Sequence, residues 1–498
     1  MAPDTAYRKL CDHLRETAVL QSCSRLLGWD QEAYMPKRGA ELRSKQLAML
    51  AGMVHRRRCS DEVKALLEEA APFTGDPDAA ANLREVRRDF EQATRVPVAL
   101  VEENTRTCTL ARRAWADARA RSDFPHFLPW LEKICGLQRR VAEALGYKGH
   151  PYDALLDRFE PDATTAELNA LFGPLRQAAV ALLDRLRGGR AVDASCLRRD
   201  YPVPQQERFA RRVIEAIGFD FERGRIDVTL HPFCSGIGPD DVRLTTRWDR
   251  RFFSDGFYSV LHEAGHGLYS QGLRADAFGL PAGQACSLGV HESQSRLWEN
   301  LVGRSAGFWR RFFPALKETF PTALGDVGLD AFTRAVNEVE AGFIRIDADE
   351  VTYNLHILLR FELEQALVKG DLAPGDVPGA WNERFTALFG ITPPDDAKGC
   401  LQDIHWSGGS IGYFPTYTLG NVYAAQLFEA AAREIGDLDD VHGRGDFAPL
   451  LAWMREKVHR VGRRLRPRAL VEAATGAPPS PEPLIRRLET HYGAVYTV

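Results

Sequence analysis

The sequence lacks the features that mark several large classes of protein. Its formal net charge at pH 7 is only −4 over 498 residues, so the whole chain has no strong field for nucleic acid or an anionic membrane. No run approaches the ~20 consecutive apolar residues of a membrane-spanning helix. Long Gly/Ser linkers, internal repeats and low-complexity tracts are also missing. These absences predict a globular protein that binds neither nucleic acid nor membrane.

Cysteine is present but shows no pattern. The nine cysteines are scattered from Cys11 to Cys400, their number is odd, and no C-x-x-C spacing occurs. The first twenty residues, "MAPDTAYRKLCDHLRETAVL", carry charges throughout and lack the apolar core of a secretory signal. We therefore expect reduced thiols and a cytoplasmic location.

Most of what remains has the periodicity of helices. Hydrophobic residues make up 45% of the chain and charged residues 27%, as in ordinary globular proteins. In "TTAELNALFGPLRQAAVALLDRL", leucines recur at helical spacing after a Thr164–Glu167 capping box, and Pro174 is predicted to bend or break the helix. Two further helices are predicted to end at Gly218 and Gly370. The fold class predicted from these segments is mainly α.

One segment is typical of strands instead. Residues 226–249, "IDVTLHPFCSGIGPDDVRLTTRWD", contain two β-rich runs around a Gly/Pro turn, which predicts a hairpin. Such a small sheet, placed directly before the next helix, could offer its edge to an extended peptide.

That next helix contains the strongest motif, "LHEAGHGLYSQG", with His262, Glu263 and His266 in H-E-x-x-H order. Residues four apart share one helix face, so both imidazoles can point at one metal ion. Glu263 lies at the edge of that face and can reach a water on the ion without being a ligand. A helix with a hydrogen-bonded core histidine and a surface glutamate is the alternative interpretation of the motif.

A catalytic zinc ion usually takes a third protein ligand. In a metzincin it is a histidine six residues after His266, but that position is Gly272. In a gluzincin it is a glutamate on a following helix, and "SLGVHESQSRLWENLVG" offers Glu292, with His291 and Glu299 as rivals. The sequence alone names no residue that orients either metal-binding histidine.

Three other motifs have simpler interpretations. The H-x-x-E spacing in "HLRE" (residues 13–16) stands in an N-terminal helix without supporting features. The tripeptide within "GRGDF" and the basic run "HRVGRRLRPRAL" are expected to be a loop and a solvated helix end.

Taken together, the motifs resemble a known family, the thermostable carboxypeptidases of the Taq type, which are zinc metallocarboxypeptidases. The resemblance runs over nearly the whole chain and is more specific than H-E-x-x-H alone. Its signatures, in order, are "WDQEAYMP", "HPF", "DVRLT", "HEAGH", "HESQ", "IRIDAD", "GCLQDIHW" and "YFPTYTLGN".

The resemblance implies a mainly helical metallopeptidase with a deep substrate groove and a small β-sheet beside the H-E-x-x-H helix. It implies one catalytic unit over residues 1–498, with an N-terminal helical part to about residue 225 and a catalytic part over about 226–498. It also implies a homodimer that removes single residues from peptide C-termini with broad preference. The metal ligands are then His262, His266 and Glu292, the base is Glu263, and the ion is zinc, with cobalt as the alternative.

Substrate-binding residues are expected in the same motifs. His405, within "GCLQDIHW", and Tyr413, shortly after it, are candidates for stabilising the oxyanion. His231 in "HPF" is expected to line the groove.

An exopeptidase must also bind a free carboxylate, which suits the planar fork of arginine. Arg345 in "IRIDAD" is the favoured candidate, and an ion pair with Asp347 or Asp349 is its structural alternative. Arg243 in "DVRLT" is the rival, although on a strand it could simply pair with Asp241.

Two alternatives to a carboxypeptidase stay open. One is a zinc endopeptidase or oligopeptidase with the same ligands, and the other is an inactive helical binding scaffold. The retained Glu263 argues against the scaffold, because a structural metal site does not need a base.

Overall fold

Helices account for most of the chain in the computed structural model, which describes residues 1–73 and 75–498. The chain divides into two units, each built from three separate segments. Unit 1 comprises Met1–Ala93, Asp193–Val336 and Ala424–Pro478, and unit 2 comprises Thr94–Val192, Asn337–Tyr423 and Pro479–Val498. No helix in the described part of the chain is long and apolar enough to cross a membrane.

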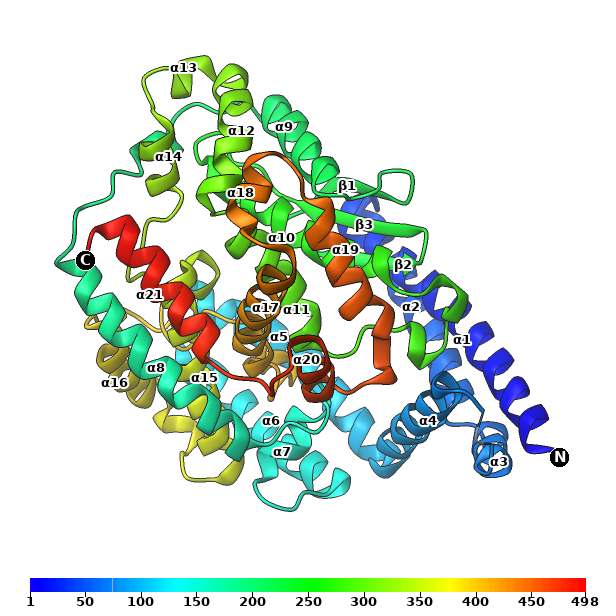
Figure 1. Cartoon of the computed structure of the whole chain (residues 1–498). Coiled ribbons are helices and arrows are strands. Elements are labelled where there is room, and N and C mark those ends of the chain that lie inside the picture. Colours follow the sequence, from blue (N-terminus) through cyan, green and yellow to red (C-terminus); the bar gives the residue numbers. More distant parts are fainter. Residues whose placement is uncertain (74) are drawn as a thin grey trace. The chain divides into compact units, whose positions relative to one another are not determined.

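Unit 1 contains the only sheet among the described residues and the helices around it (Figure 1). Its helices are α1 (Pro3–Ala33), α2 (Ala40–Arg58), α3 (Asp61–Ala70), α4 (Pro77–Arg95, whose last residues pass into unit 2), α9 (Val203–Ala216), α10 (Phe253–Gly272), α11 (Leu288–Arg296), α12 (Ala306–Thr319), α13 (Pro321–Leu324), α14 (Leu329–Ala335), α18 (Leu438–Gly443), α19 (Ala448–Lys457) and α20 (Pro467–Thr475). Short 3₁₀ segments lie at Lys37–Gly39, Ser195–Arg198, Ala275–Ala277, Pro281–Gly283 and His459–Arg464, and a π-helical segment at Leu297–Val302.

Unit 2 contains helices and no strand among its described residues. Its helices are α5 (Val98–Arg121), α6 (Phe124–Leu145), α7 (Pro151–Leu156), α8 (Thr165–Arg187), α15 (Glu350–Lys369), α16 (Val377–Phe389) and α21 (Glu482–Tyr496), with 3₁₀ segments at Arg345–Asp347, Pro374–Asp376 and Trp406–Gly408. Helices α8 and α21 pack against each other (Figure 1). Helix α17 (Pro415–Ile435) begins in unit 2 and continues into unit 1.

The predicted helix boundaries hold where local chemistry sets them. Thr164 and Glu167 form the expected capping box of α8. Gly218 and Gly370 follow the ends of α9 and α15 with φ of 105° and 93°, a left-handed conformation that suits glycine. Helix α8 continues through Pro174, so of the two predicted outcomes, a bend or a break, the break does not occur. Pro174 is exposed on α8, so the carbonyl that loses its partner faces the solvent side and can be hydrated.

The predicted hairpin is only partly correct. The sheet has three strands, β1 (Gly224–Val228), β2 (Cys234–Gly238) and β3 (Asp241–Thr246), in the order β1-β3-β2. The strands β2 and β3 form an antiparallel hairpin, whereas β1, the first predicted run, pairs with β3 in parallel. The prediction missed β2 because glycine is a poor strand former and occupies two of its five positions.

Helix α1 covers part of the free edge of β2. Arg25 on α1 donates a hydrogen bond from Nη1 to the Gly236 carbonyl at 3.0 Å. At Gly236 the edge is therefore used by the protein itself and is not open to a peptide. The "WDQEAYMP" motif also braces this sheet, since the Tyr34 hydroxyl donates to Asp227 at 2.5 Å.

The sheet packs on α10, and a cluster of aromatic side chains supports the first half of that helix. Phe253 and Phe257 of α10 are buried, and their rings contact those of Tyr201, Phe209, Trp309, Phe320 and Phe332. Burying each such ring stabilises the fold by roughly 1.5–3 kcal/mol. The predicted class, mainly α with a small sheet beside the H-E-x-x-H helix, is confirmed.

The basic run at residues 459–470 is not a solvated helix end. Arg463 is largely buried and pairs with Glu85 and Asp89 of α4 at 3.0 and 2.7 Å, and Arg466 lies 3.3 Å from Glu85. These ion pairs tie the segment to α4 within unit 1.

Candidate metal centre

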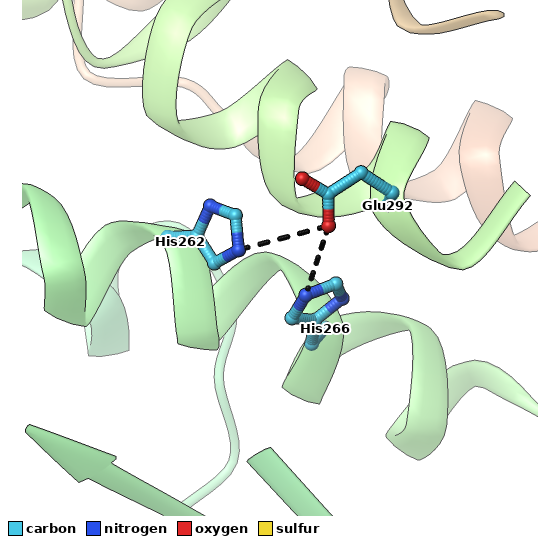
Figure 2. Close-up of side chains that lie close together, drawn as sticks. All are labelled: His262, His266 and Glu292. Atoms are coloured by element: carbon cyan, nitrogen blue, oxygen red, sulfur yellow. Dashed lines mark ion pairs between the residues drawn. The ribbon is translucent and has the colours of Figure 1, made fainter. Parts of the chain in front are cut away.

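His262 and His266 lie one turn apart on α10, and both imidazoles point toward the Glu292 carboxylate on α11 (Figure 2). Glu292 Oε2 lies 3.8 Å from His262 Nε2 and 3.5 Å from His266 Nε2. Donor atoms around a tetrahedral zinc ion stand about 3.3 Å apart, given bonds of roughly 2.0–2.1 Å. Two imidazoles and one carboxylate at this spacing therefore fit a single divalent ion, and among the described residues these three form the group that could hold one.

A glycine allows α10 and α11 to approach closely enough for this arrangement. A Cβ at Gly265, between the two histidines, would lie 2.5 Å from the Gln294 carbonyl oxygen and 2.6 Å from the Ser295 Cα. Any side chain at this position would push α11, and with it Glu292, away from the histidines.

Glu299 and His291, the two alternatives for the third ligand, contact His262 and His266 at Nδ1, on the opposite side of each ring from Nε2. Glu299 Oε2 accepts a hydrogen bond from His262 Nδ1 at 2.8 Å, and the His291 carbonyl accepts one from His266 Nδ1 at 3.1 Å. His291 Nδ1 also lies 2.7 Å from His266 Nδ1. Such contacts fix each ring with Nε2 toward Glu292, and in metal sites they raise the basicity of the histidine. Glu299 and His291 are therefore placed as supports of the ligands.

The π-helical segment that follows α11 carries Glu299. Leu297, Leu301 and Val302 of this segment are buried, so they form an inward-packing face. A π-turn changes the helical register of the residues after it, and such turns are common at functional sites. Here the turn belongs to the segment that contacts His262 through Glu299.

Arg296 holds the second oxygen of the Glu292 carboxylate. Its Nε donates to Glu292 Oε1 at 2.7 Å and its Nη1 donates to Glu299 Oε2 at 3.2 Å. With Oε1 engaged, Oε2 is the oxygen that faces the histidines. The sequence contained a signal for this contact, because an arginine four residues after a glutamate shares its helix face.

Glu263 is buried beside the ligands, and its Oε2 has no hydrogen-bond partner among the described residues. Burial raises the Glu263 pKa to about 7, although the nearby His262 lowers it. For Glu299 burial works in the same direction, but Arg296 and His262 outweigh it and lower the pKa to about 2. The centre thus places one carboxylate with a raised pKa beside another whose pKa is lowered.

The position where a metzincin carries its third histidine is closed. A Cβ at Gly272 would lie 2.1 Å from Nδ1 of His459, whose ring packs against Tyr269. His459 Nε2 lies 3.0 Å from Gln294 Oε1, so this imidazole contacts both α10 and α11. The sequence offered no signal for this contact, because His459 lies in a distant segment.

Three of the predicted substrate-binding residues, Arg345, His405 and Tyr413, lie in unit 2, where they belong to one cluster of side chains. Arg345 is buried, and its Nε and Nη2 donate to Asp403 Oδ1 at 3.0 and 2.8 Å. Its Nη1 donates to the Tyr353 hydroxyl at 3.2 Å. Its acidic partner is thus neither Asp347 nor Asp349, the alternatives weighed from the sequence; Asp349 instead caps α15.

Asp403 is shared by a second arginine that the sequence did not single out. Arg360 on α15 is fully buried and donates from Nε to Asp403 Oδ2 at 2.7 Å. The two guanidinium groups outweigh burial and lower the Asp403 pKa. His405 Nδ1 lies 3.8 Å from Asp403 and its Nε2 3.3 Å from the Tyr417 hydroxyl. Burial lowers the His405 pKa to about 4 despite the neighbouring Asp403, so this imidazole is neutral at pH 7.

The remaining candidates lie in unit 1. His231 is exposed in the loop between β1 and β2. Arg243 donates two hydrogen bonds to Asp241 at 2.7 and 2.8 Å, as anticipated for an arginine on a strand, and its guanidinium lies 4.2 Å from the Trp29 ring centre. His13, of the H-x-x-E spacing, lies 3.4 Å from Glu62 and contributes to helix packing.

Comparisons with known proteins identify the family of this chain. Residues 9–492 match the carboxypeptidase Taq (M32) metallopeptidase family. The chain is 48% identical to thermostable carboxypeptidase 1 of Thermus thermophilus over the full length of both, and 35% identical to carboxypeptidase 1 of Bacillus subtilis over 99% of each. The fold matches the crystal structure of an M32 carboxypeptidase from Deinococcus radiodurans with a TM-score of 0.97, at 41% identity over 99% of this chain and 100% of that one. The chain therefore belongs to the carboxypeptidase Taq (M32) family and is a metallocarboxypeptidase, an enzyme that hydrolyses peptides.

Proposed function

We propose that the enzyme releases single C-terminal amino acids of many kinds, with zinc held by His262, His266 and Glu292 and with Glu263 as general base. The observation that carries this proposal is the convergence of the three donors beside a buried carboxylate whose Oε2 has no partner among the described residues.

Zinc suits the donor set better than other common divalent ions do. Two imidazoles and one carboxylate are the ligands of many catalytic zinc sites, whereas magnesium and calcium prefer oxygen alone. A bound ion supplies positive charge that polarises the scissile carbonyl and makes a nearby water more acidic. Cobalt, which accepts the same ligands, is the alternative, and elemental analysis of protein purified without added metal distinguishes the two.

Glu263 provides the proton transfers. Its carboxylate takes a proton from the attacking water and later gives that proton to the leaving amine. A buried position without a competing partner keeps the carboxylate available for this exchange. Glu263→Gln keeps the shape of the side chain but cannot accept the proton, so we expect normal metal content and a rate at least ~10²-fold lower. Wild-type activity in this variant would show that Glu263 is not the general base.

We propose further that Arg345 binds the terminal carboxylate, that His405 and Tyr413 stabilise the oxyanion, and that His231 lines the groove. Asp403 and Tyr353 engage part of the Arg345 guanidinium. Each Nη atom has a second N–H, which can donate to a carboxylate end-on.

Two experiments test the exopeptidase assignment. A peptide incubated with enzyme and metal, and sampled by mass spectrometry, should lose one residue at a time from its C-terminus. Internal cuts would indicate an endopeptidase instead, and an inert peptide would indicate an inactive scaffold.

The second experiment combines Arg345→Ala with amidated peptides. A charge-assisted contact contributes about 1.5–3 kcal/mol, so the variant should lose roughly 10- to 200-fold in kcat/KM on free acids. It should lose little on amidated peptides, which are poor substrates already. Arg243→Ala is the matched control, since its partner Asp241 and the Trp29 ring account for its position. If the loss caused by Arg345→Ala and the loss caused by amidation of the peptide simply add, Arg345 does not bind the carboxylate.

We also propose a cytoplasmic homodimer in which residues 1–498 form one catalytic unit. All nine cysteines are free thiols, which supports a reducing compartment. The homodimer and the deep groove rest on the family resemblance. Sedimentation at micromolar concentration tests the dimer, since a monomer throughout that range would exclude it.

A further inference from the structure

Glu364 is a buried carboxylate that the proposed reaction does not use. It lies on α15 in unit 2 and is 0% exposed. No ion pair involves it among the residues that the structure describes; Arg360, one turn earlier, pairs with Asp403 instead. A buried ionisable group without an opposite charge destabilises a fold unless other contacts offset its burial. Its presence therefore calls for a physical reason.

Three hydrogen-bond donors converge on this carboxylate. The Tyr152 hydroxyl on α7 donates to Oε2 at 2.6 Å, and the Gly412 backbone amide donates to the same oxygen at 3.0 Å. The Trp406 indole Nε1 donates to Oε1 at 2.9 Å. Both oxygens are thus engaged, and two of the three donors come from one segment, residues 405–413.

The two donors in that segment adjoin the proposed oxyanion-binding residues. Trp406 directly follows His405, and Gly412 directly precedes Tyr413. Gly412 has φ of 96°, and a Cβ there would lie 2.8 Å from the Leu155 carbonyl carbon. The segment therefore packs backbone to backbone on α7 at this residue. Glu364 holds it at both ends, one residue away from each candidate side chain.

The charged and titratable groups around Glu364 agree with this tight packing. Burial raises the Glu364 pKa to about 7, against the effect of its three donors and of Arg360. Burial and the adjacent Glu364 both raise the Tyr152 pKa. On α6, Cys135 also has a raised pKa, mainly through burial. Apart from Arg360, none of these groups carries a positive charge that could replace the three hydrogen bonds.

We propose that Glu364 is a positioning residue of this enzyme, which holds residues 405–413 so that His405 and Tyr413 meet the substrate in the geometry the reaction needs. This inference rests on the proposed function, in which those two side chains contact the reacting carbonyl. Glu364 itself touches no substrate and acts through the segment that it holds.

Glu364→Gln tests the proposal with little change of shape. An amide offers one acceptor oxygen, so it cannot receive the Trp406 and Gly412 donors on separate atoms. We expect normal metal content and circular dichroism. Hydrogen exchange in the peptide over residues 406–413 should be at least ~10-fold faster, and kcat should be roughly 10- to 100-fold lower with KM changed less than about threefold. Glu362→Gln is the matched control on the same helix, because Glu362 is partly exposed and pairs with Arg176 at 3.0 Å. It should change none of these quantities.

A double-mutant cycle separates positioning from general stabilisation. In a Tyr413→Phe or His405→Ala background, Glu364→Gln should cost little further activity, because it acts through those residues. If its effect on kcat simply adds to theirs, or if exchange and kcat both stay at wild-type values, the proposal is overturned. If Glu364→Gln does not fold, Trp406→Phe removes one of the three donors and should raise exchange and lower kcat by about three- to tenfold. Wild-type values for Trp406→Phe would overturn the proposal as well.

Failure of the Glu364 proposal can be distinguished from failure of the proposed metal chemistry. Failure of the proposed function appears as a wild-type enzyme that makes no C-terminal ladder or as a fully active Glu263→Gln variant. Full activity in both Tyr413→Phe and His405→Ala would instead show that these side chains do not contact the substrate. The proposed role of Glu364 would then fail as well, while the proposed metal site would be unaffected.

Discussion

Replacing Gly265 by alanine should weaken metal binding without unfolding the protein. The added Cβ would lie 2.5 Å from the Gln294 carbonyl oxygen and 2.6 Å from the Ser295 Cα, and both are backbone atoms of α11. Ordinary contact between carbon atoms needs about 3.5–4.0 Å. Helix α11 must therefore move away from α10 by about 1 Å.

The movement displaces Glu292, the proposed third ligand. Glu292 lies only two residues before Gln294 on the same helix, so its Oε2 shifts by a similar distance away from His262 and His266. Metal–ligand distances tolerate only about ±0.2 Å. A shift of this size should weaken metal binding at least ~10- to 100-fold, as the loss of a supporting contact does.

The effect on stability should be smaller. Overpacking costs about 1–3 kcal/mol, whereas alanine is favoured over glycine within a helix by about 1 kcal/mol. The net loss of about 0–2 kcal/mol leaves the fold intact. Gly267→Ala is the matched control on α10, because its Cβ would meet the side chains of Phe219 and Leu244 at 2.7 and 2.9 Å, on the side of the sheet. It should cost similar stability and retain the metal.

The assay is a chelator competition for the bound ion, with thermal unfolding of the apoprotein measured in parallel. Unchanged metal affinity in Gly265→Ala would refute the argument that this glycine sets the distance between α10 and α11. Equal loss of metal in Gly267→Ala would assign the effect to general destabilisation.

Three further predictions concern Arg296, the third metal ligand and Glu364. Arg296→Met frees Glu292 Oε1 and should weaken metal binding about 10- to 100-fold in the same competition assay. Unchanged affinity would show that the contact between Arg296 and Glu292 does not support metal binding. Glu292→Ala should lose metal and activity together, whereas Glu299→Ala should keep its metal at reduced affinity, and the opposite pattern in elemental analysis would make Glu299 the third ligand. Because the folded-state pKa of Glu364 is raised to about 7, its stabilising contribution is present in acid and is lost as pH rises through 7. The difference in free energy of unfolding between wild type and Glu364→Gln should therefore fall by about 2 kcal/mol from pH 5 to pH 8, and a constant difference in urea titrations would exclude this linkage.

The parts of the candidate metal centre that depend only on the periodicity of one helix could be predicted from the sequence. His262 and His266 share a face because they are four residues apart, and that relation needs no tertiary information. Glu292 was one of three possible third ligands, because the return of the chain after α10 decides which side chain meets the histidines. The supports could not be predicted, since one is the backbone carbonyl of His291 and the other, Glu299, lies in a π-turn that no local pattern announced.

The same limit applies to the rest of the fold. Capping boxes and terminal glycines predicted helix ends correctly, because these contacts are local. The parallel pairing of β1 with β3 depends on a crossover, and the contact between Arg345 and Asp403 joins residues 58 positions apart. The continuity of α8 through Pro174 depends on which face of the helix is exposed. Such features are settled by packing, which the residue pattern of one segment does not contain.

The interleaving of the two units has a consequence for how the enzyme is made. The chain passes from one unit to the other five times, so no contiguous fragment consists of one complete unit alone. All the residues of the metal centre have been synthesised by Glu299, yet His459, which packs beneath α10 at Gly272, belongs to the last segment of unit 1. During synthesis the centre must therefore wait for residues 424–478 before its support is complete, and contacts this distant in sequence form slowly. Truncation before that segment should yield a chain that carries every ligand but lacks the packing that holds them together.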